Sequence, residues 1–512
     1  MTFEKTLPGF AVLSGLAFSL IVPSPSARAN VYATNVKLNG DYTNVVCAQG
    51  TGLSISYLLN EPATLGVAIN ILSGSNSVRT ISVPAGSPGA LRGTNSVFWD
   101  GLDFSSNNVP GGTYSVAVTA LAAGFTNWTQ TSVDTNPGNY VWEPEGIAVD
   151  QNRASRYFGR VFIGNADTNP QGTNVGDHIG ILKLNADASP AEESPTNWVS
   201  TGGYVWSGGN VSPWKIQVSA DDRVYIMDEG SSPPGLIYNW DPTISTNYVA
   251  VLQPDNLGDS GAVIPNGLAL SGSGTNSELF IADTRDWLGF GPSGSLGIIK
   301  YNLLDGACAT NDTGITVVAT HDNPDGSSTG TNLDESPYDV ALDPNQNLYV
   351  IQYIEPIPPD NLPDVASRVL RFPAYNPSAN GGAPEITPTW YAGSLDDSYD
   401  GAAGVAVDPT ATYVAVALVG LTNGNFRILS ATNGALLADL DLDTNAPATH
   451  YDTACAWDAA GNAMSQSTTT LRTFPAWWPR ACGKSFRRRA PTRPPRLRLK
   501  LCRLLRQRHN RR

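Results

Sequence analysis

The sequence is poor in cysteine and histidine, and this shortage limits the chemistry that it can carry. Only five cysteines and four histidines occur among 512 residues. The histidines lie far apart in the sequence and form no ligand-like pair. The cysteines show no close-paired metal spacing and are too few for a disulfide scaffold; they are Cys47, Cys308, Cys455, Cys482 and Cys502. We therefore expect no disulfide bond.

Long apolar runs are absent after the first 29 residues. No later segment is apolar for about 18 residues, so we expect no membrane span. Residues 1–29 combine Lys5, an apolar run over residues 9–22 and the small-residue site Ala27-Arg28-Ala29, which is the pattern of a signal peptide. The sequence predicts a secreted or periplasmic protein. An uncleaved N-terminal anchor is the alternative, because the negative charge of Glu4 offsets the positive charge of Lys5.

Basic residues are scarce in the body of the chain. Residues 30–471 hold 14 Lys or Arg against 44 Asp or Glu, so their net charge is −30. Such a surface repels nucleic acid and anionic membranes and favours cation binding. We expect no nucleic-acid partner and a monomer.

Glycine and proline are plentiful, with 50 and 37 copies, which is too turn-rich for a helical protein and favours an all-β fold. Residues 30–125 begin with period-two alternation, as in Leu53, Ile55, Tyr57 and Leu59, which is typical of half-buried strands. Further strands are expected around residues 65–71 and 114–118. The pattern predicts a small antiparallel sandwich.

The end of this block, SVFWDGLDFSSNNVPGGTYSVAVTA, resembles the Ig-like domain of flagellar hook-capping proteins. The resemblance implies a structural or adhesive module without catalytic residues. We expect Trp99 and Tyr114 to fill the core between the sheets. We expect Asp100 and Asp103 to form turns rather than to bind metal.

A six-fold repeat follows a Thr/Asn/Pro linker over residues 126–139. First strands EGIAVD, WKIQVS, NGLALS, YDVALD, AGVAVD and TACAWD recur at intervals of 50 to 72 residues. A second strand such as RVFIGN and a third such as GILKLN follow each one, although the sixth repeat lacks a clear second strand. Repeats of this period predict a β-propeller.

The predicted fold is therefore an all-β chain with an Ig-like β-sandwich followed by a six-bladed β-propeller over residues 140–475. The repeats resemble NHL-type and gluconolactonase-type propellers. Because few core contacts are expected to cross the linker, we expect cleavage there to release two folded pieces.

The gluconolactonase resemblance implies one divalent cation held by a Glu, an Asn and an Asp. Glu145 and Asn266 match two of those positions. The Asp position falls on Tyr338, with Asp339 one residue further, and a second Asn position falls on Trp214. In that family the metal would polarise a lactone or ester carbonyl.

Loops that lead into the first strands are rich in acids and aromatics and are expected to meet at the mouth of the propeller. Oxygen ligands suit calcium or another divalent cation, and an aromatic rim suits a sugar or peptide. The candidate metal ligands are Glu145, Asn266, Asp339, Asp400 and Asp452. The candidate ligand-binding residues are Trp142, Trp214, Tyr338 and His450.

Two functions remain open at this point. The first is a secreted, non-catalytic protein that binds a carbohydrate, peptide or cell-surface ligand and has no catalytic residues. The second is a divergent metal-dependent lactonase or esterase. Acidic loops are common throughout an acidic protein. This is the simpler explanation of the acidic residues expected at the mouth of the propeller.

The C-terminus changes composition abruptly. From Arg472 onward there are 15 Lys or Arg and no Asp or Glu. Leu471-Arg472-Thr473-Phe474 still parallels the third strands, and we expect residues 476–512 to be a disordered tail apart from a short helix over residues 497–507. The tail is an anionic-surface arm, a segment folded on the acidic body, or the product of a shifted reading frame.

Overall fold

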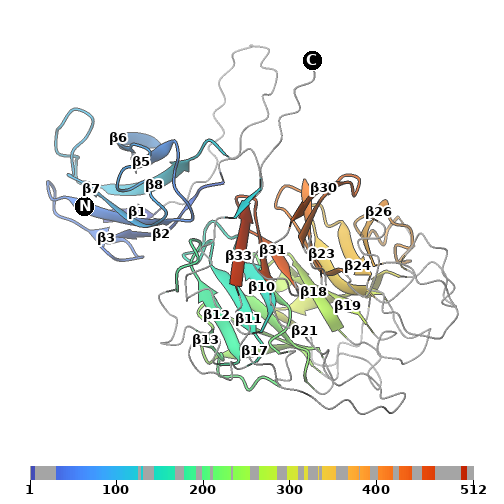
Figure 1. Cartoon of the computed structure of the whole chain (residues 1–512). Coiled ribbons are helices and arrows are strands. Elements are labelled where there is room, and N and C mark those ends of the chain that lie inside the picture. Colours follow the sequence, from blue (N-terminus) through green and yellow to red (C-terminus); the bar gives the residue numbers. More distant parts are fainter. Residues whose placement is uncertain are drawn as a thin grey trace, which may run out of the picture.

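The computed structural model describes residues 2–5, 30–124, 128–130, 143–167, 178–191, 199–207, 212–231, 235–253, 265–284, 297–308, 316–320, 333, 337–352, 367–379, 381–392, 402–418, 426–440, 453–467 and 498–503. Among these residues the regular structure is β-strand, apart from one 3₁₀ helix at Gly274–Asn276. The all-β class predicted from the sequence is confirmed. Figure 1 shows the N-terminal strands gathered beside a larger group of small sheets.

Two sheets pack face to face in the N-terminal part. One has the order β2-β4-β7 and the other β3-β1-β8-β5-β6. Their strands are β1 Thr2–Lys5, β2 Ala33–Leu38, β3 Val45–Val46, β4 Leu53–Leu59, β5 Gly66–Ser73, β6 Asn76–Val83, β7 Gly93–Trp99 and β8 Thr113–Leu121. The strand β1 falls within the predicted signal peptide, whose residues 6–29 lie outside the described part, so the signal peptide stays a prediction.

The core between these two sheets contains the residues that the period-two pattern selected. Trp99 and Tyr114 are buried with ring centroids 6.3 Å apart. The Asp100 carboxylate accepts the Leu102 N–H at 3.0 Å, and Asp103 shapes the turn that follows. These four expectations are confirmed.

Six further sheets follow along the chain, and we call them S1 to S6. S1 contains β10 Pro144–Val149, β11 Val161–Asn165, β12 Gly180–Leu184 and β13 Val199–Ser200. S2 contains β14 Ile216–Val218, β15 Val224–Asp228, β16 Leu236–Trp240 and β17 Tyr248–Leu252. S3 contains β18 Pro265–Ser271, β19 Glu278–Asp283, β20 Ile298–Leu304, β21 Ala307–Cys308 and β22 Thr316–Ala319.

S4 contains β23 Pro337–Leu342, β24 Leu348–Gln352, β25 Arg368–Phe372 and β26 Trp390–Ala392. S5 contains β27 Ala402–Val407, β28 Tyr413–Leu418, β29 Phe426–Ser430 and β30 Leu436–Leu440. S6 contains β31 Cys455–Trp457, β32 Asn462–Ser467, β33 Arg498–Arg503 and β9 Thr129–Gln130.

The first strands of these sheets contact one another in sequence order. β10 contacts β14, and the contacts continue through β18, β23, β27 and β31. β31 in turn contacts β10. We call these six strands the inner strands. All six lie where the repeated sequence motif predicts them, and second strands such as β11 and β15 are buried along their whole length, as their apolar runs predict.

S6 differs from its expected form in three ways. Its second strand is β32, a polar segment that the repeat pattern missed. Its third strand is β33, where we expected a helix, and its fourth strand, β9, lies inside the predicted linker. The helix prediction is wrong because RLKLCR alternates basic and apolar residues with period two, which is a strand pattern. The expected strand at residues 471–474 lies outside the described residues.

An acidic or hydroxyl residue directly after most inner strands closes the turn to the second strand. The Asp343 carboxylate accepts N–H groups from Asn345 and Asn347 at 2.8 and 3.0 Å. Asp408 and Asp458 accept backbone N–H groups in the same way. The recurring aspartate of the repeat is therefore a turn residue, because its side chain replaces a missing backbone acceptor.

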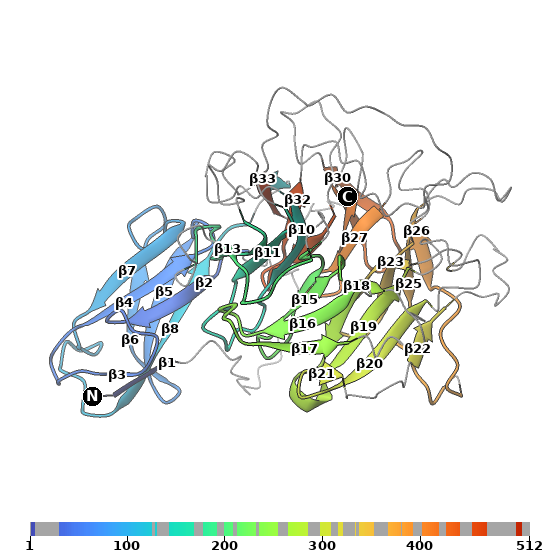
Figure 2. The ribbon, with the colours of Figure 1, turned by 90° about the horizontal axis from the view of Figure 1, so that it is seen from below.

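The sandwich packs directly against S1 and S6. Tyr32 and Phe158 have ring centroids 5.1 Å apart and are buried together with Leu58 and Ala186. The Asn462 side-chain amide donates to the Asn30 carbonyl at 3.2 Å. The expectation that few core contacts join the two parts is therefore wrong, and Figure 2 shows the two parts side by side.

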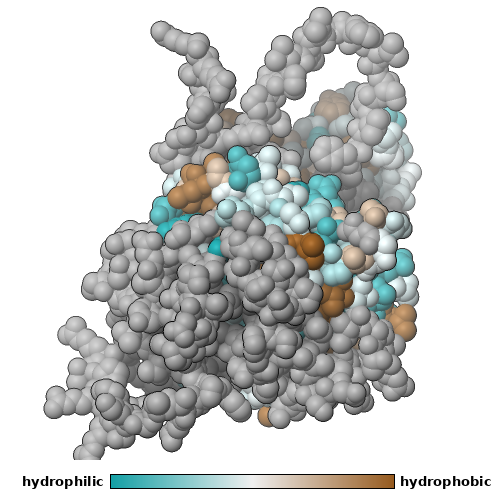
Figure 3. All heavy atoms as spheres, turned by 90° about the vertical axis from the view of Figure 1, so that its right-hand side faces the viewer, coloured by the Kyte–Doolittle hydropathy of each residue, from teal (hydrophilic) through white to brown (hydrophobic). Residues whose placement is uncertain are grey.

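The described surface carries apolar residues only in separate small groups on the side shown in Figure 3. Apolar residues scattered in this way are usual for a protein surface. Among the described residues, no helix has the length and apolarity that crossing a membrane requires. The described cysteines Cys47, Cys308 and Cys455 form no disulfide bond.

The contact between Tyr32 and Phe158 leads to a stability prediction. We expect Phe158→Ala to lower the free energy of unfolding by about 3 kcal/mol, because it leaves a cavity between sandwich and S1. The matched control is Phe104→Ala, whose ring is 59% exposed and whose removal should change stability by less than about 0.5 kcal/mol. Urea unfolding followed by tryptophan fluorescence measures both. Equal effects of the two variants would show that the contact is not stabilising.

The turn residue Asp150 predicts a pH dependence of stability. Burial, and to a lesser degree the nearby Asp222 carboxylate, raise the pKa of Asp150 to about 7. The folded protein then holds this proton at higher pH than the unfolded chain, so its contribution is complete below about pH 4 and is lost as the pH rises through 7. Since one pKa unit corresponds to about 1.4 kcal/mol, this part of the stability amounts to about 4 kcal/mol.

We expect Asp150→Asn to remove this fall in stability between pH 4 and 7 while keeping the acceptor for the Asn152 N–H. Thermal unfolding across that pH range measures it. Asp439→Asn, at an exposed position of β30, serves as the control and should keep the wild-type profile. A variant at position 150 with an unchanged profile would contradict the assignment.

Candidate functional site

The inner strands start with a shared irregularity. The register shifts between Pro144 and Gly146 in S1, and the same shift occurs at the corresponding positions of S3, S4 and S5. A β-bulge of this kind leaves one residue outside the ladder of backbone hydrogen bonds. The residues between the shifted pairs are Glu145, Asn266, Tyr338 and Ala403. The bulges thus set apart the positions that the sequence marked as candidate ligands.

The next position along each inner strand alternates between glycine and a larger residue. Glycine occupies it in S1, S3 and S5, as Gly146, Gly267 and Gly404. A Cβ added to Gly146 would lie 2.1 Å from the Trp214 carbonyl oxygen, and one added to Gly267 would lie 2.5 Å from the Asp339 Cα. No side chain fits at such distances. Glycine is therefore required here, because the inner strand of the following sheet passes too close for any larger residue.

Lys215 occupies this position in S2 and joins three other sheets. Its Nζ donates to Asp339 Oδ2 at 3.0 Å, to the Ala403 carbonyl at 2.8 Å and to the Thr453 carbonyl at 2.8 Å. These acceptors belong to or adjoin the inner strands of S4, S5 and S6. An ammonium group has three donors, and all three are used. We call Lys215, Asp339, Glu145 and Asn266 the central site.

Asp339 is the counter-ion of this ammonium. Its side chain and that of Lys215 are only 8% and 6% exposed. Asp339 Oδ2 also accepts the Val405 N–H at 3.1 Å. Burial raises the pKa of Asp339, and the positive charge of Lys215 opposes this rise. The pair is therefore a buried, hydrogen-bonded ion pair.

Aromatic side chains and Asn266 surround the ammonium. The Lys215 Nζ lies 5.8 Å from the Trp214 ring and 5.9 Å from the Tyr338 ring, at the outer limit of a cation–π contact. The Trp214 indole donates to the Asn266 carbonyl at 3.1 Å, and the Asn266 side-chain amide donates to the Tyr338 carbonyl at 2.7 Å. These bonds join the starts of the inner strands of S2, S3 and S4.

The structure places the predicted site residues unevenly. Glu145 and Asn266 are buried at the starts of β10 and β18, and Asp339 is engaged by Lys215. Trp214 and Tyr338 are buried beside the ammonium, where their predicted part in ligand binding stays a prediction. The other predicted residues are Trp142, Asp400, His450 and Asp452, which lie outside the described residues.

The described part of the central site does not contain a complete set of ligands for a divalent cation. Within the described ranges, no group of three or more His, Cys, Asp or Glu side chains could hold a metal ion. Asp339 Oδ2, which could serve as a metal ligand, already accepts a hydrogen bond from the Lys215 ammonium. Asn266 directs its amide nitrogen at the Tyr338 carbonyl, so its side-chain oxygen is the atom that could bind a cation.

Sequence reasoning did not identify Lys215. A signal was present, because Lys215 is the single basic residue at a position that other repeats fill with glycine, alanine or aspartate. A lysine in an otherwise apolar inner strand requires a buried counter-charge. Asp339, in the corresponding position two repeats later, is the only acid at this level of the repeat.

No family model matches the chain, and no curated protein matches it either. Solved structures that resemble it include the hydrazine synthase of Kuenenia stuttgartiensis, with a TM-score of 0.32 and 14% identity over 66% of this chain and 78% of that chain. The major allergen Mala s 1 of Malassezia sympodialis has a TM-score of 0.28 and 12% identity, over 50% and 73% of the two chains.

An exo-1,5-α-L-arabinanase from a bovine ruminal metagenomic library has a TM-score of 0.27 and 9% identity, over 56% and 90% of the two chains. Likenesses at these values carry no argument about the function of this chain. The NHL and gluconolactonase resemblance therefore stays a prediction.

The central ion pair predicts a large effect of removing its cation. We expect Lys215→Met to lower the free energy of unfolding by about 3 to 5 kcal/mol, because it leaves Asp339 buried without a counter-charge. Adding Asp339→Asn to Lys215→Met should recover part of this loss. Chemical denaturation of the single and double variants measures the coupling. A loss below about 1 kcal/mol for Lys215→Met would contradict a stabilising ion pair.

Proposed function

We propose that this chain is an exported binding protein, with an Ig-like sandwich followed by a six-bladed β-propeller that carries no catalytic centre. The order of contacts among the inner strands, with β31 beside β10, supports the propeller. S6 combines β9 from before S1 with β33 from the C-terminal end, an arrangement that would close a ring. The ligand would be a carbohydrate, a peptide or a cell-surface molecule.

The position of the Lys215 ammonium is the observation that carries this proposal. The gluconolactonase resemblance implies a divalent cation beside Glu145 and Asn266, whereas in this chain the Lys215 ammonium joins Asp339 of S4 to backbone carbonyls at the inner strands of S5 and S6. A metal ion can take a substrate oxygen as an extra ligand and polarise it. This ammonium has given all of its donors to the protein, so it has none left for a carbonyl substrate.

A metal-dependent lactonase or esterase is the alternative, favoured by Glu145 and Asn266, which occupy equivalent bulges in S1 and S3. Asp400 and Asp452 lie outside the described residues, so calcium binding by the loops also stays a proposal. Binding of calcium without turnover agrees with the function proposed here.

A hydrolysis screen combined with calcium calorimetry separates the two functions. We expect no turnover of aliphatic lactones or aryl esters by the wild type, with calcium, manganese or zinc present, because the central site holds an ammonium. Turnover that depends on a metal and disappears in Glu145→Gln or Asn266→Ala would establish the alternative. Glu278→Gln is the matched control, since Glu278 pairs with Lys300 and lies opposite Ser271, at the other end of β18 from Asn266.

A further inference from the structure

A cavity lies among the inner strands at the level of their ends, beyond Lys215 along each strand. It has a volume of about 540 Å³. Two residues after the position of Lys215, five of the six inner strands carry alanine, and the sixth carries glutamine. These residues all line the cavity and are Ala148, Gln217, Ala269, Ala341, Ala406 and Ala456. Small side chains at this level leave the space open.

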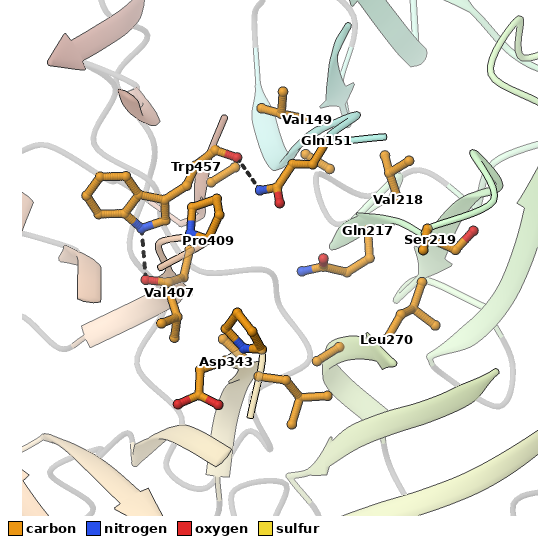
Figure 4. A pocket seen from close by; sticks show the side chains of 18 of the residues that line it. Val149, Gln151, Gln217, Val218, Ser219, Leu270, Asp343, Val407, Pro409 and Trp457 are labelled. Carbon is orange, nitrogen blue, oxygen red and sulfur yellow. Dashed lines mark hydrogen bonds between the residues drawn. The ribbon is translucent and has the colours of Figure 1, made fainter. Parts of the chain in front are cut away.

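Gln217 is the exception in this alanine set, and Figure 4 shows its carboxamide pointing into the cavity. Its backbone belongs to β14 and is paired with Tyr225, so the strand fixes the base of the side chain. Within the described part of the chain, the Gln217 carboxamide forms no hydrogen bond. One acceptor and two donors therefore remain for a molecule in the cavity.

Several other polar groups around the cavity are already engaged, although the side chains of Ser271 and Gln346 also line it. The Asp343 carboxylate is held by the backbone of its own turn and by the Asn347 side chain. Asp408 accepts N–H groups of its own turn in the same way. The Gln151 amide donates to the Trp457 carbonyl at 2.7 Å, as drawn in Figure 4. The carboxylates at this end therefore accept hydrogen bonds from local donors and do not need a ligand to supply them.

Part of the remaining wall is aliphatic. Val149, Val218, Leu270 and Val407 surround the carboxamide, with Pro409 at the edge. Volumes of about 300 to 1,000 Å³ with mostly apolar walls and a few polar groups are usual for small-molecule sites. A compact, uncharged ligand with C–H surface and paired hydroxyl groups would match both the aliphatic part of the wall and the Gln217 carboxamide.

We propose that this cavity binds one unit of a neutral sugar, with Gln217 as its specificity-determining residue. The carboxamide donates to one ring hydroxyl and accepts from a neighbouring one, and the aliphatic walls contact the C–H face. This site lies on the far side of Lys215 from Glu145 and Asn266. It goes beyond the function proposed above and would hold even if the central site were catalytic.

Calorimetry and saturation-transfer NMR with methyl glycosides of glucose, galactose, mannose and arabinose test the proposal on the full-length protein. We expect at least one glycoside to bind the wild type and its affinity to fall about tenfold or more in Gln217→Leu, because two hydrogen bonds are lost. Gln217→Asn should weaken binding less, since it keeps the amide on a shorter chain. Gln253→Leu, the same substitution directly after β17, should bind as the wild type does.

Thermal unfolding of all variants separates loss of binding from loss of fold. If Gln217→Leu does not fold, competition between the best glycoside and N-methylacetamide on the wild type decides the question instead. Three results would overturn the proposal: no glycoside binds, a glycoside binds Gln217→Leu as tightly as the wild type, or N-methylacetamide binds more tightly than every glycoside. Binding independent of Gln217 would place the sugar elsewhere and leave the proposed binding function standing.

Discussion

The close approach of the six inner strands is the constraint on which the rest of this structure depends. Where one inner strand passes the next, backbone atoms come so near that Gly146 and Gly267 admit no side chain. S1, S3 and S5 have glycine at this position. The sheets between them, S2 and S4, have Lys215 and Asp339, whose side chains meet there. The ion pair is thus a consequence of backbone packing, and its burial follows from the same geometry.

Because the pair is buried, its stability depends on the hydrogen bonds that surround it. Removing two charges from water costs several kcal/mol for each ion, and the cost is offset only when geometry and additional hydrogen bonds are favourable. Lys215 meets this condition through two backbone carbonyls, and Asp339 through the Val405 N–H. The same bonds leave the ammonium no donor for a substrate. The ion pair therefore joins the inner strands of S2, S4, S5 and S6.

The sandwich and the six sheets also depend on each other. Tyr32 and Phe158 share one buried cluster, and Asn462 of S6 bonds to the backbone of Asn30 in the N-terminal part. S6 takes its outer strand β9 from the segment that follows the sandwich. The segment predicted as a flexible linker thus contributes to a sheet. The sandwich is therefore joined to the six sheets by buried contacts as well as by the chain.

The sequence by itself located the inner strands and the main strands of the sandwich. Alternation in Leu53 to Leu59 and the recurring first-strand motif located the strands, because periodicity reflects which face of a strand is buried. It also identified Glu145 and Asn266 as special positions. Only the tertiary structure showed the contact of Lys215 with Asp339, because these residues are 124 positions apart in the sequence. The sequence also did not predict that β32 pairs with β33. This pairing depends on the path of the chain in three dimensions, which local sequence patterns do not encode.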